Sequence, residues 1–138
     1  MTIEQISVFL ENKSGRLAEV TGALGEAGVN MRAATIADTA DFGILRMVVD
    51  NPEKALKALD EKGFTAKVTK VFAIELDDTP GGLASIMKLF HETGVNIEYL
   101  YSSLENTGGK AVVIFKVDDV DHGNRIVKEH KLTAIKQL

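Results

Sequence analysis

Two short polar loops contain the residues of this sequence that are best suited to bind a small anion. Residues 11–16 read ENKSGR and residues 77–82 read DDTPGG. Each loop precedes an amphipathic pattern that is typical of a helix, so its glycine-bearing end would lie at a helix N-terminus. Free backbone N–H groups and the helix dipole attract a carboxylate there, and glycine lets the anion approach the backbone closely.

A polar side chain lies at a matched distance beyond each loop. Asn30 and Asn96 both follow a Gly-Val pair and precede a stretch that is typical of a strand. One such loop on its own is more simply explained as a turn with an Asx cap. Because both loops have an Asn at the same spacing, the pairing favours a binding site.

The two loops belong to an internal repeat that covers the sequence. At a shift of 66, residues 10–31 align with residues 76–97 and share a GxLA motif and a GVN triplet. After two extra residues in the second copy, the match resumes at a shift of 68, where Val49-Asp50 aligns with Val117-Asp118. The repeat predicts two domains, residues 1–70 and 71–138, with almost no linker near Lys70.

Each copy is predicted to form a strand, a helix, two strands, a second helix and a last strand. The opening strands alternate strictly around residues 6–10 and 72–76, which is the period of a half-buried strand. The first helices each carry one apolar stripe, and a glycine follows where a left-handed residue commonly ends a helix. The stripe residues are Leu17, Val20, Leu24 and Ala27 in one copy and Leu83, Ile86, Met87 and Phe90 in the other.

The second helix of the first copy is predicted to begin at Asn51-Pro52-Glu53. Asn favours the cap position, Pro the first helical position, and Glu the positive end of the dipole. Its counterpart is predicted to begin around residues 118–121, although Gly123 lies inside it and glycine disfavours a helix interior. Turns at residues 38–41 and 106–109 precede the central strands.

This order of elements indicates a ferredoxin-like α+β fold in each copy, with an antiparallel sheet and two helices on one face. The linker is almost absent and unpaired edge strands are unfavourable. The two copies are therefore expected to form one sheet of about eight strands with helices on one face. That fold hosts many unrelated functions, so function depends on the site.

The composition excludes several classes of partner. The net charge of −4 and the acidic residues among the C-terminal lysines argue against nucleic acid. The absence of cysteine excludes disulfides and thiolate metal sites. No apolar stretch approaches the roughly 20 residues that span a bilayer, and the N-terminal residues lack a signal-peptide pattern. We expect a soluble, cytoplasmic protein that contacts no membrane.

No set of residues indicates an active site. His91, His122 and His130 lack the spacing of metal ligands, and none lies near a glycine-rich loop. The adjacent carboxylates at residues 77–78 and 118–119 are typical of turn caps, and no phosphate-binding loop is present. The sequence therefore predicts no enzymatic activity, no metal and no cofactor.

The second copy resembles the ACT domains, the amino-acid-sensing modules of biosynthetic enzymes such as phosphoglycerate dehydrogenase and aspartokinase. The resemblance rests on DDTPGGLASIMKLFHETGVNIEYLY, with a D-x-P-G-x-L loop, an amphipathic helix and a GVNI strand start. The first copy matches with Ser14 in place of the proline, which implies a less rigid loop. The resemblance implies that loop amides hold an amino acid's carboxylate, while Asn or Asp side chains hold its amino group.

The loop and the Asn of one copy are too far apart to contact the same small ligand. They would lie at opposite ends of a helix of about 12 residues, which is roughly 18 Å long. A second copy, turned antiparallel to the first, would bring its Asn next to the other copy's loop. We therefore pair the loop of Asn12 with Asn96 and the loop of Asp78 with Asn30. The alternative is that these sites form between the chains of a homodimer.

Two functions remain open. The chain is either a sensor of a free amino acid or a regulatory subunit that mainly contacts a biosynthetic enzyme or a transcription regulator. Phe9 alternates with the buried residues of its strand, which indicates a partly apolar sheet face and would favour the second function. The candidate ligand-binding residues are Asn12, Lys13, Ser14, Gly15, Arg16, Leu17, Asn30 and Met31 in the first copy, and Asp78, Thr79, Pro80, Gly81, Gly82, Leu83, Asn96 and Ile97 in the second.

Overall fold

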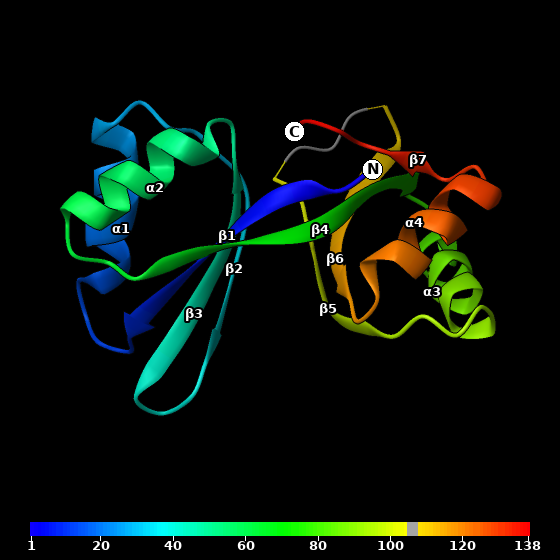
Figure 1. The fold of residues 1–138 in the computed structure, drawn as a ribbon, viewed down its shortest axis with the longest axis horizontal. Helices are drawn as coiled ribbons and strands as arrows, with labels where there is room; N and C mark the ends of the chain where they lie inside the picture. The colour runs from blue at the N-terminus through cyan, green and yellow to red at the C-terminus, as the bar shows by residue number, and fades with distance from the viewer. Residues whose placement is uncertain (105–107) are drawn as a thin grey trace. The chain divides into compact units, whose positions relative to one another are not determined.

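A computed structural model describes residues 1–104 and 108–138 of the chain (Figure 1). These residues form two compact units. The first unit comprises Glu4–Thr69 with Leu138, and the second comprises Lys70–Gln137 with Met1–Ile3. Each unit has its own hydrophobic core.

The first unit follows the predicted order of elements. They are β1 (Ile3–Glu11), α1 (Arg16–Glu26), β2 (Met31–Asp38), β3 (Phe42–Val49), α2 (Pro52–Glu61) and the first part of β4 (Ala66–Asp77). The strand order is β2-β3-β1-β4, and β3 pairs antiparallel with both β1 and β2.

The second unit repeats this arrangement. Its elements are the later part of β4, then α3 (Gly82–Glu92), β5 (Ile97–Ser102), β6 (Lys110–Val117), α4 (Val120–Glu129) and β7 (Thr133–Ala134). The strand order is β5-β6-β4, and β7 also pairs with β4. The predicted ferredoxin-like α+β fold is therefore confirmed for both units.

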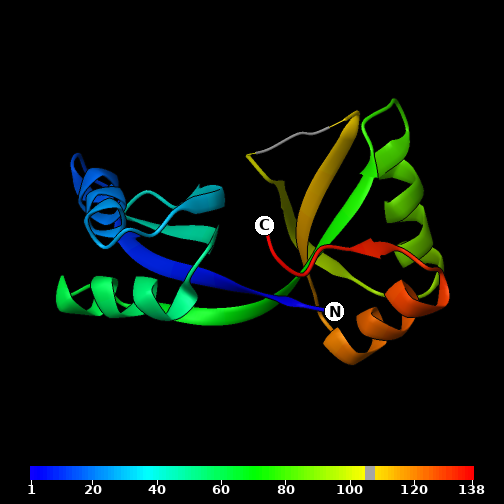
Figure 2. The same ribbon diagram turned by 90° about the horizontal axis from the view of Figure 1, so that it is seen from above.

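β4 explains why the described residues form seven strands rather than the expected eight. The closing strand of the first copy and the opening strand of the second are one strand of 12 residues. Residues 66–77 contain no glycine or proline, so no residue in the segment favours a break. Figure 2 shows β4, in green, as an unbroken ribbon.

The core of the first unit lies between its sheet and its two helices. Alternate positions of β1 point toward the helices, as the pattern predicts. Burying one such aliphatic side chain contributes about 1.5–3 kcal/mol. The fully or nearly buried residues of this core include Ile6, Val8 and Leu10 of β1, Val20 and Leu24 of α1, Leu45 and Met47 of β3, and Ala55 and Leu59 of α2.

One part of the predicted apolar stripe is wrong. Leu17 is 45% exposed, and its counterpart Leu83 is 36% exposed. Both leucines lie in the first turn of their helix, directly after a candidate loop. The buried stripe therefore begins one turn later, and each leucine faces solvent beside the loop.

Aromatic rings fill the core of the second unit. Phe72 and Phe115 are stacked with their ring centroids 5.7 Å apart, and Phe90 meets Phe115 edge-on at 5.1 Å. The predicted helix α4 is confirmed, and this packing explains Gly123 inside it. A Cβ atom at Gly123 would lie 2.9 Å from the ring of Phe72, which is too close for an ordinary contact.

The helix ends also agree with the sequence. The side chain of Asn51 accepts a hydrogen bond from the N–H of Lys54 at 3.2 Å, as predicted for the start of α2. Gly28 and Gly94 have φ angles of 73° and 77°, which is the left-handed conformation expected after α1 and α3. The turn at residues 38–41 joins β2 and β3. The other predicted turn, 106–109, lies partly outside the described residues.

We predict that Gly123→Ala lowers the stability of the second unit by about 1–3 kcal/mol, because the added methyl group overpacks the core at Phe72. Gly22 is a matched control, since it lies inside α1 and a Cβ there meets nothing within 4 Å. Gly22→Ala should raise stability by about 0.5–1 kcal/mol. Urea unfolding of both variants measures the two changes in the free energy of unfolding. Equal changes of the same sign in both variants would contradict the close packing of Gly123 against Phe72.

Candidate functional site

Both candidate loops pass from strand to helix through a left-handed glycine. Gly15 has φ 91° and Gly81 has φ 86°, and each is the N-cap of its helix. No side chain accepts a capping hydrogen bond at either helix start, so the simple alternative of an Asx-capped turn does not hold for these described helices. The N–H of the first helical residue, Arg16 or Gly82, donates to the loop carbonyl of Lys13 or Thr79 at 3.4 or 3.0 Å. The N–H groups that follow lack the side-chain acceptor that commonly caps a helix.

The first loop is tied to the hairpin between β2 and β3. The N–H of Asn12 donates to the carbonyl of Asp41 at 2.9 Å. The side-chain NH₂ of Asn12 donates to the carbonyls of Thr39 and Ala40 at 3.3 and 3.4 Å. Because these bonds use the NH₂ group, the Oδ1 atom of Asn12 can accept a bond from a ligand.

The second loop has the same anchor. The N–H of Asp78 donates to the carbonyl of Gly109 at 2.9 Å, which is the equivalent of the bond from Asn12. The N–H of Thr79 closes the turn on the carbonyl of Asp77 at 2.9 Å. Asn12 and Asp78 thus occupy one structural position, as the repeat predicts.

An aspartate that the sequence analysis missed holds each candidate Asn. The N–H of Asn30 donates to Oδ1 of Asp50 at 3.0 Å, and that of Asn96 donates to Oδ1 of Asp118 at 3.2 Å. In return, the N–H of each aspartate donates to the carbonyl of its Asn at 3.1 Å. The signal was present, because Val-Asp is one of the pairs shared at the shift of 68.

Within one unit, the loop and the Asn do not come together. α1 and α3 each have 11 residues, and the loop and the Asn lie at opposite ends. At 1.5 Å per residue, the separation is roughly 16 Å. The structure therefore brings together the loop residues of each unit but not the loop and the Asn of the same unit.

The remaining candidate residues divide into exposed and half-buried ones. Ser14 and the neighbouring Lys13 are exposed, as are Pro80 and Thr79. Met31 and Ile97 begin β2 and β5 and are half-buried, so they contribute mainly to packing at the strand starts. Both are packed against the hydrophobic cores of their units.

A hollow of about 500 Å³ lies beside the second loop. Lys110, which the sequence analysis did not select, lines it and forms an ion pair with Asp77, its neighbour on the adjacent strand. The hydrogen bond that Lys110 donates to Asp77, and then the charge of that carboxylate, raise the pKa of Lys110 above its ordinary value. The residues that line the hollow are Glu75, Leu76, Asp77, Thr79, Pro80, Gly81, Gly82, Ser85, Ile86 and Lys110.

A smaller hollow of about 200 Å³ in the first unit is lined by residues 9–11 of β1, by Arg16 and Phe42, and by residues 62–65. Arg16 borders it and bonds Glu19 at 3.0 Å and Glu11 at 3.2 Å. Lys13 also pairs with Glu11 at 3.1 Å. The hydrogen bond and charge of Lys13, followed by the charge of Arg16, lower the pKa of the Glu11 carboxyl.

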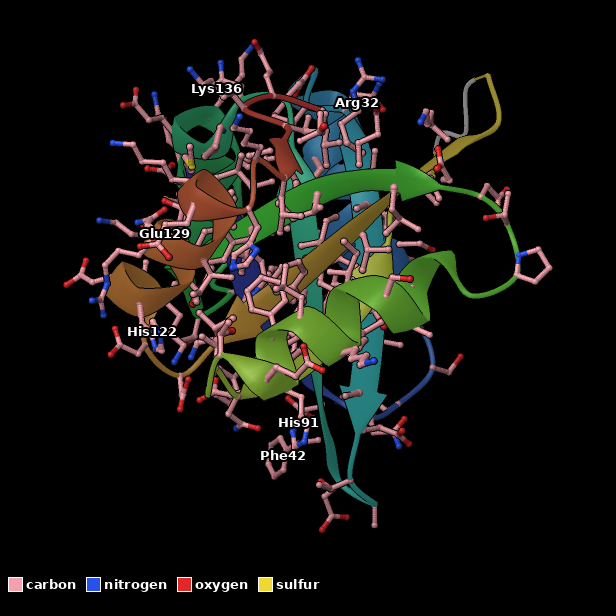
Figure 3. The ribbon with its side chains drawn as sticks, turned by 90° about the vertical axis from the view of Figure 1, so that its right-hand side faces the viewer. Arg32, Phe42, His91, His122, Glu129 and Lys136 are labelled. Carbon is pink, nitrogen blue, oxygen red and sulfur yellow. The ribbon has the colours of Figure 1, made fainter. Side chains whose placement is uncertain are left out.

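The histidines do not form a site in the part of the chain that the structure describes. His91 and His122 lie on separate helices, α3 and α4 (Figure 3). Among the described residues, no three His, Cys, Asp or Glu side chains gather in a way that could hold a metal ion. No described helix is both long and apolar enough to cross a membrane.

A family model of the ACT domain pair matches residues 1–138. The chain belongs to the ACT domain pair family. ACT domains are regulatory, and the resemblance inferred from the loop and the GVN motif is therefore confirmed. The chain is an ACT-domain regulatory protein.

Related proteins agree with the ACT fold. The crystal structure of a protein from Bacteroides thetaiotaomicron is 41% identical, with a TM-score of 0.92, over 98% of this chain and 92% of that one. The regulatory subunit of aspartate kinase from Thermus thermophilus, in a ligand-free form, shares the fold at 22% identity, with a TM-score of 0.64 and 91% of each chain covered.

One relative with a named role matches part of the ACT pair. The acetolactate synthase isozyme 3 small subunit of Escherichia coli strain K12 is 36% identical over 59 residues. The match covers 41% of this chain and 36% of that protein, so the similarity reaches little more than a third of the relative.

We predict that Asp50→Ala loosens the strand start of the first ACT unit. The variant loses the charge-assisted hydrogen bond to the N–H of Asn30, which is worth about 1 kcal/mol at an exposed position. Hydrogen exchange at the Asn30 amide should therefore become about fivefold faster. Asp60→Ala, at another exposed aspartate, is the control and should leave that amide unchanged. Unchanged exchange in Asp50→Ala would contradict this role of Asp50.

Proposed function

We propose that this chain is a regulatory protein that binds a free amino acid and catalyses no reaction. The observation that carries the proposal is the repeated loop, in which Gly15 or Gly81 leads into a helix without a side-chain cap. The N–H groups there suit the ligand's carboxylate, and the helix dipole favours the same charge.

The ligand's ammonium group needs acceptors close to the loop. Oδ1 of Asn12 and the carboxylate of Asp78 are suitable, because ammonium is a donor without an acceptor. The candidate Asn must come from a different copy, since α1 and α3 separate each loop from the Asn of its own unit. The repeat supplies another copy in the same chain, and a homodimer is the alternative source.

The cytoplasm is the compartment in which such a protein would encounter free amino acids and the enzymes that make them. A chain without cysteine is compatible with that reducing environment. The ligand would be released near cellular concentrations, which corresponds to micromolar to millimolar affinity, or roughly −4 to −8 kcal/mol.

A regulatory subunit whose main role is protein contact is the second candidate. Phe9 is 49% exposed and Phe42 is 58% exposed, and exposed apolar surface of this kind commonly marks a protein contact. The relatives named as a small subunit of acetolactate synthase and a regulatory subunit of aspartate kinase favour a biosynthetic enzyme over a transcription regulator as the partner. Both functions can occur in one protein.

We predict that at least one of the twenty protein amino acids stabilises the chain against heat. A ligand that binds only the folded state at 100 times its Kd adds about 2.7 kcal/mol. Thermal-shift measurements with each amino acid at millimolar concentration, followed by calorimetry, test this. If no amino acid stabilises the chain and none releases heat, the sensor function is wrong and protein contact becomes the better proposal.

We predict that Asp78 and Asn30 act on one binding event. Asp78→Ala and Asn30→Ala should each weaken binding by about 1–3 kcal/mol, or roughly 5- to 150-fold, because each leaves part of the ligand unpaired. The double variant should lose less than the sum, because both side chains would contact one small ligand. Asp78 and Asn96 are the control pair and should show no coupling. Coupling of Asp78 with Asn96 instead would contradict a site completed by another copy.

A further inference from the structure

The sheet of the first unit carries an apolar patch on the face that points away from α1 and α2. Phe9 alternates with the core residues of β1 and therefore lies on that face. It pairs across the strands with Ile44 of β3, which pairs in turn with Ala37 of β2. Phe42 lies two residues before Ile44 and points to the same side. These four residues form a patch across three strands, the open-face patch.

A hollow of about 280 Å³ lies within the open-face patch. A cavity of about 150 Å³ in another protein holds a benzene ring, so this hollow is large enough for an aromatic side chain. Phe42 is 58% exposed, and its ring stands away from the hairpin end of β3 (Figure 3). The surface thus offers both a projecting ring and a hollow that can hold one.

The two ends of the hollow have opposite charges. Asp38 lines it at the hairpin end, close to the exposed Asp41 of the turn. Arg46 lines the other end, four residues along β3 from Phe42. A half-turn about an axis across the strands would bring the acidic end of one copy onto Arg46 of a second copy. The same half-turn would place each Phe42 over the hollow of the other copy, so the patch is complementary to itself.

The second unit carries charged residues at the equivalent positions. Glu75 replaces Phe9 at the shift of 66, and Lys110 replaces Phe42 at the shift of 68. Lys110 is further held by its ion pair with Asp77. Charged side chains resist transfer from water to an apolar contact. The apolar patch therefore belongs to the first unit, which gives each chain one self-complementary surface and favours a closed pair over a longer assembly.

We propose that the open-face patch is an interface between two copies of this chain, with Phe42 of each copy in the hollow of the other. The patch is separate from the candidate loops, so this inference does not rest on the sensor function. It assigns the exposed Phe9 and Phe42 to a second copy rather than to a biosynthetic enzyme.

Sedimentation velocity of the full-length chain, from about 1 µM to 1 mM, tests the inference. We expect a reversible equilibrium between monomer and dimer. Phe42→Ser should weaken the dimer about 10- to 50-fold, because each dimer loses two aromatic contacts. Ile36→Ser is the matched control, since Ile36 is 48% exposed in the same unit but pairs with the core residue Leu45 and faces the helix side. It should change the dimer Kd less than twofold.

A charge reversal tests the complementarity without altering an apolar residue. Asp38→Lys would place a cation opposite Arg46 of the second copy and should weaken the dimer about 5- to 25-fold. Asp60→Lys, at an exposed position of α2, is the control and should change the dimer Kd less than twofold. Circular dichroism of each variant checks that it is folded, and Asp38→Lys decides the test if Phe42→Ser does not fold.

Three results would overturn the inference. A wild-type chain that stays monomeric over the whole range would leave the open-face patch to another protein. A dimer with unchanged affinity in folded Phe42→Ser or in Asp38→Lys would place the contact elsewhere on the chain. Equal weakening in Phe42→Ser and Ile36→Ser would show a general effect of exposed apolar surface, which contradicts a specific contact at Phe42.

Discussion

The left-handed glycine between strand and helix is the constraint on which the site depends in both units. A φ near +90° turns the chain sharply after β1 and β4 without a side-chain cap. After the first helical N–H, which donates to a loop carbonyl, the helix has backbone donors that no side chain caps. The hairpin carbonyls hold the loop in place through Asn12 and Asp78. The anion-attracting character of the loop therefore follows from backbone geometry rather than from a charged residue.

On this common backbone, the two units carry different side chains beside the loop. Where Gly82 leaves space, Lys110 and Asp77 make a polar, charged hollow. In the first unit, Arg16 and Phe42 take the positions of Gly82 and Lys110, and Arg16 pairs with Glu11 and Glu19. The repeat keeps the fold of both units, while the side chains beside the two loops differ.

The sequence predicted the fold, because the hydrophobic periodicity, the helix-capping residues and the internal repeat all indicated the same elements. It could not predict that the closing and opening strands merge into β4, since an absent linker is compatible with either two strands or one. Leu17 fits the helical stripe but lies beyond the core, because periodicity does not show where a core ends. The sequence did not indicate Lys110, because Lys110 is 33 residues from Asp77 and comes beside the loop only through the pairing of β4 with β6.

The loop amides provide the most direct test of the account. In an NMR titration of the full-length chain with the amino acid that stabilises it best, the backbone amide signals of residues 81–83 should shift and saturate together with the heat of binding. Saturable binding that leaves those three signals unchanged would contradict a carboxylate held at the start of α3.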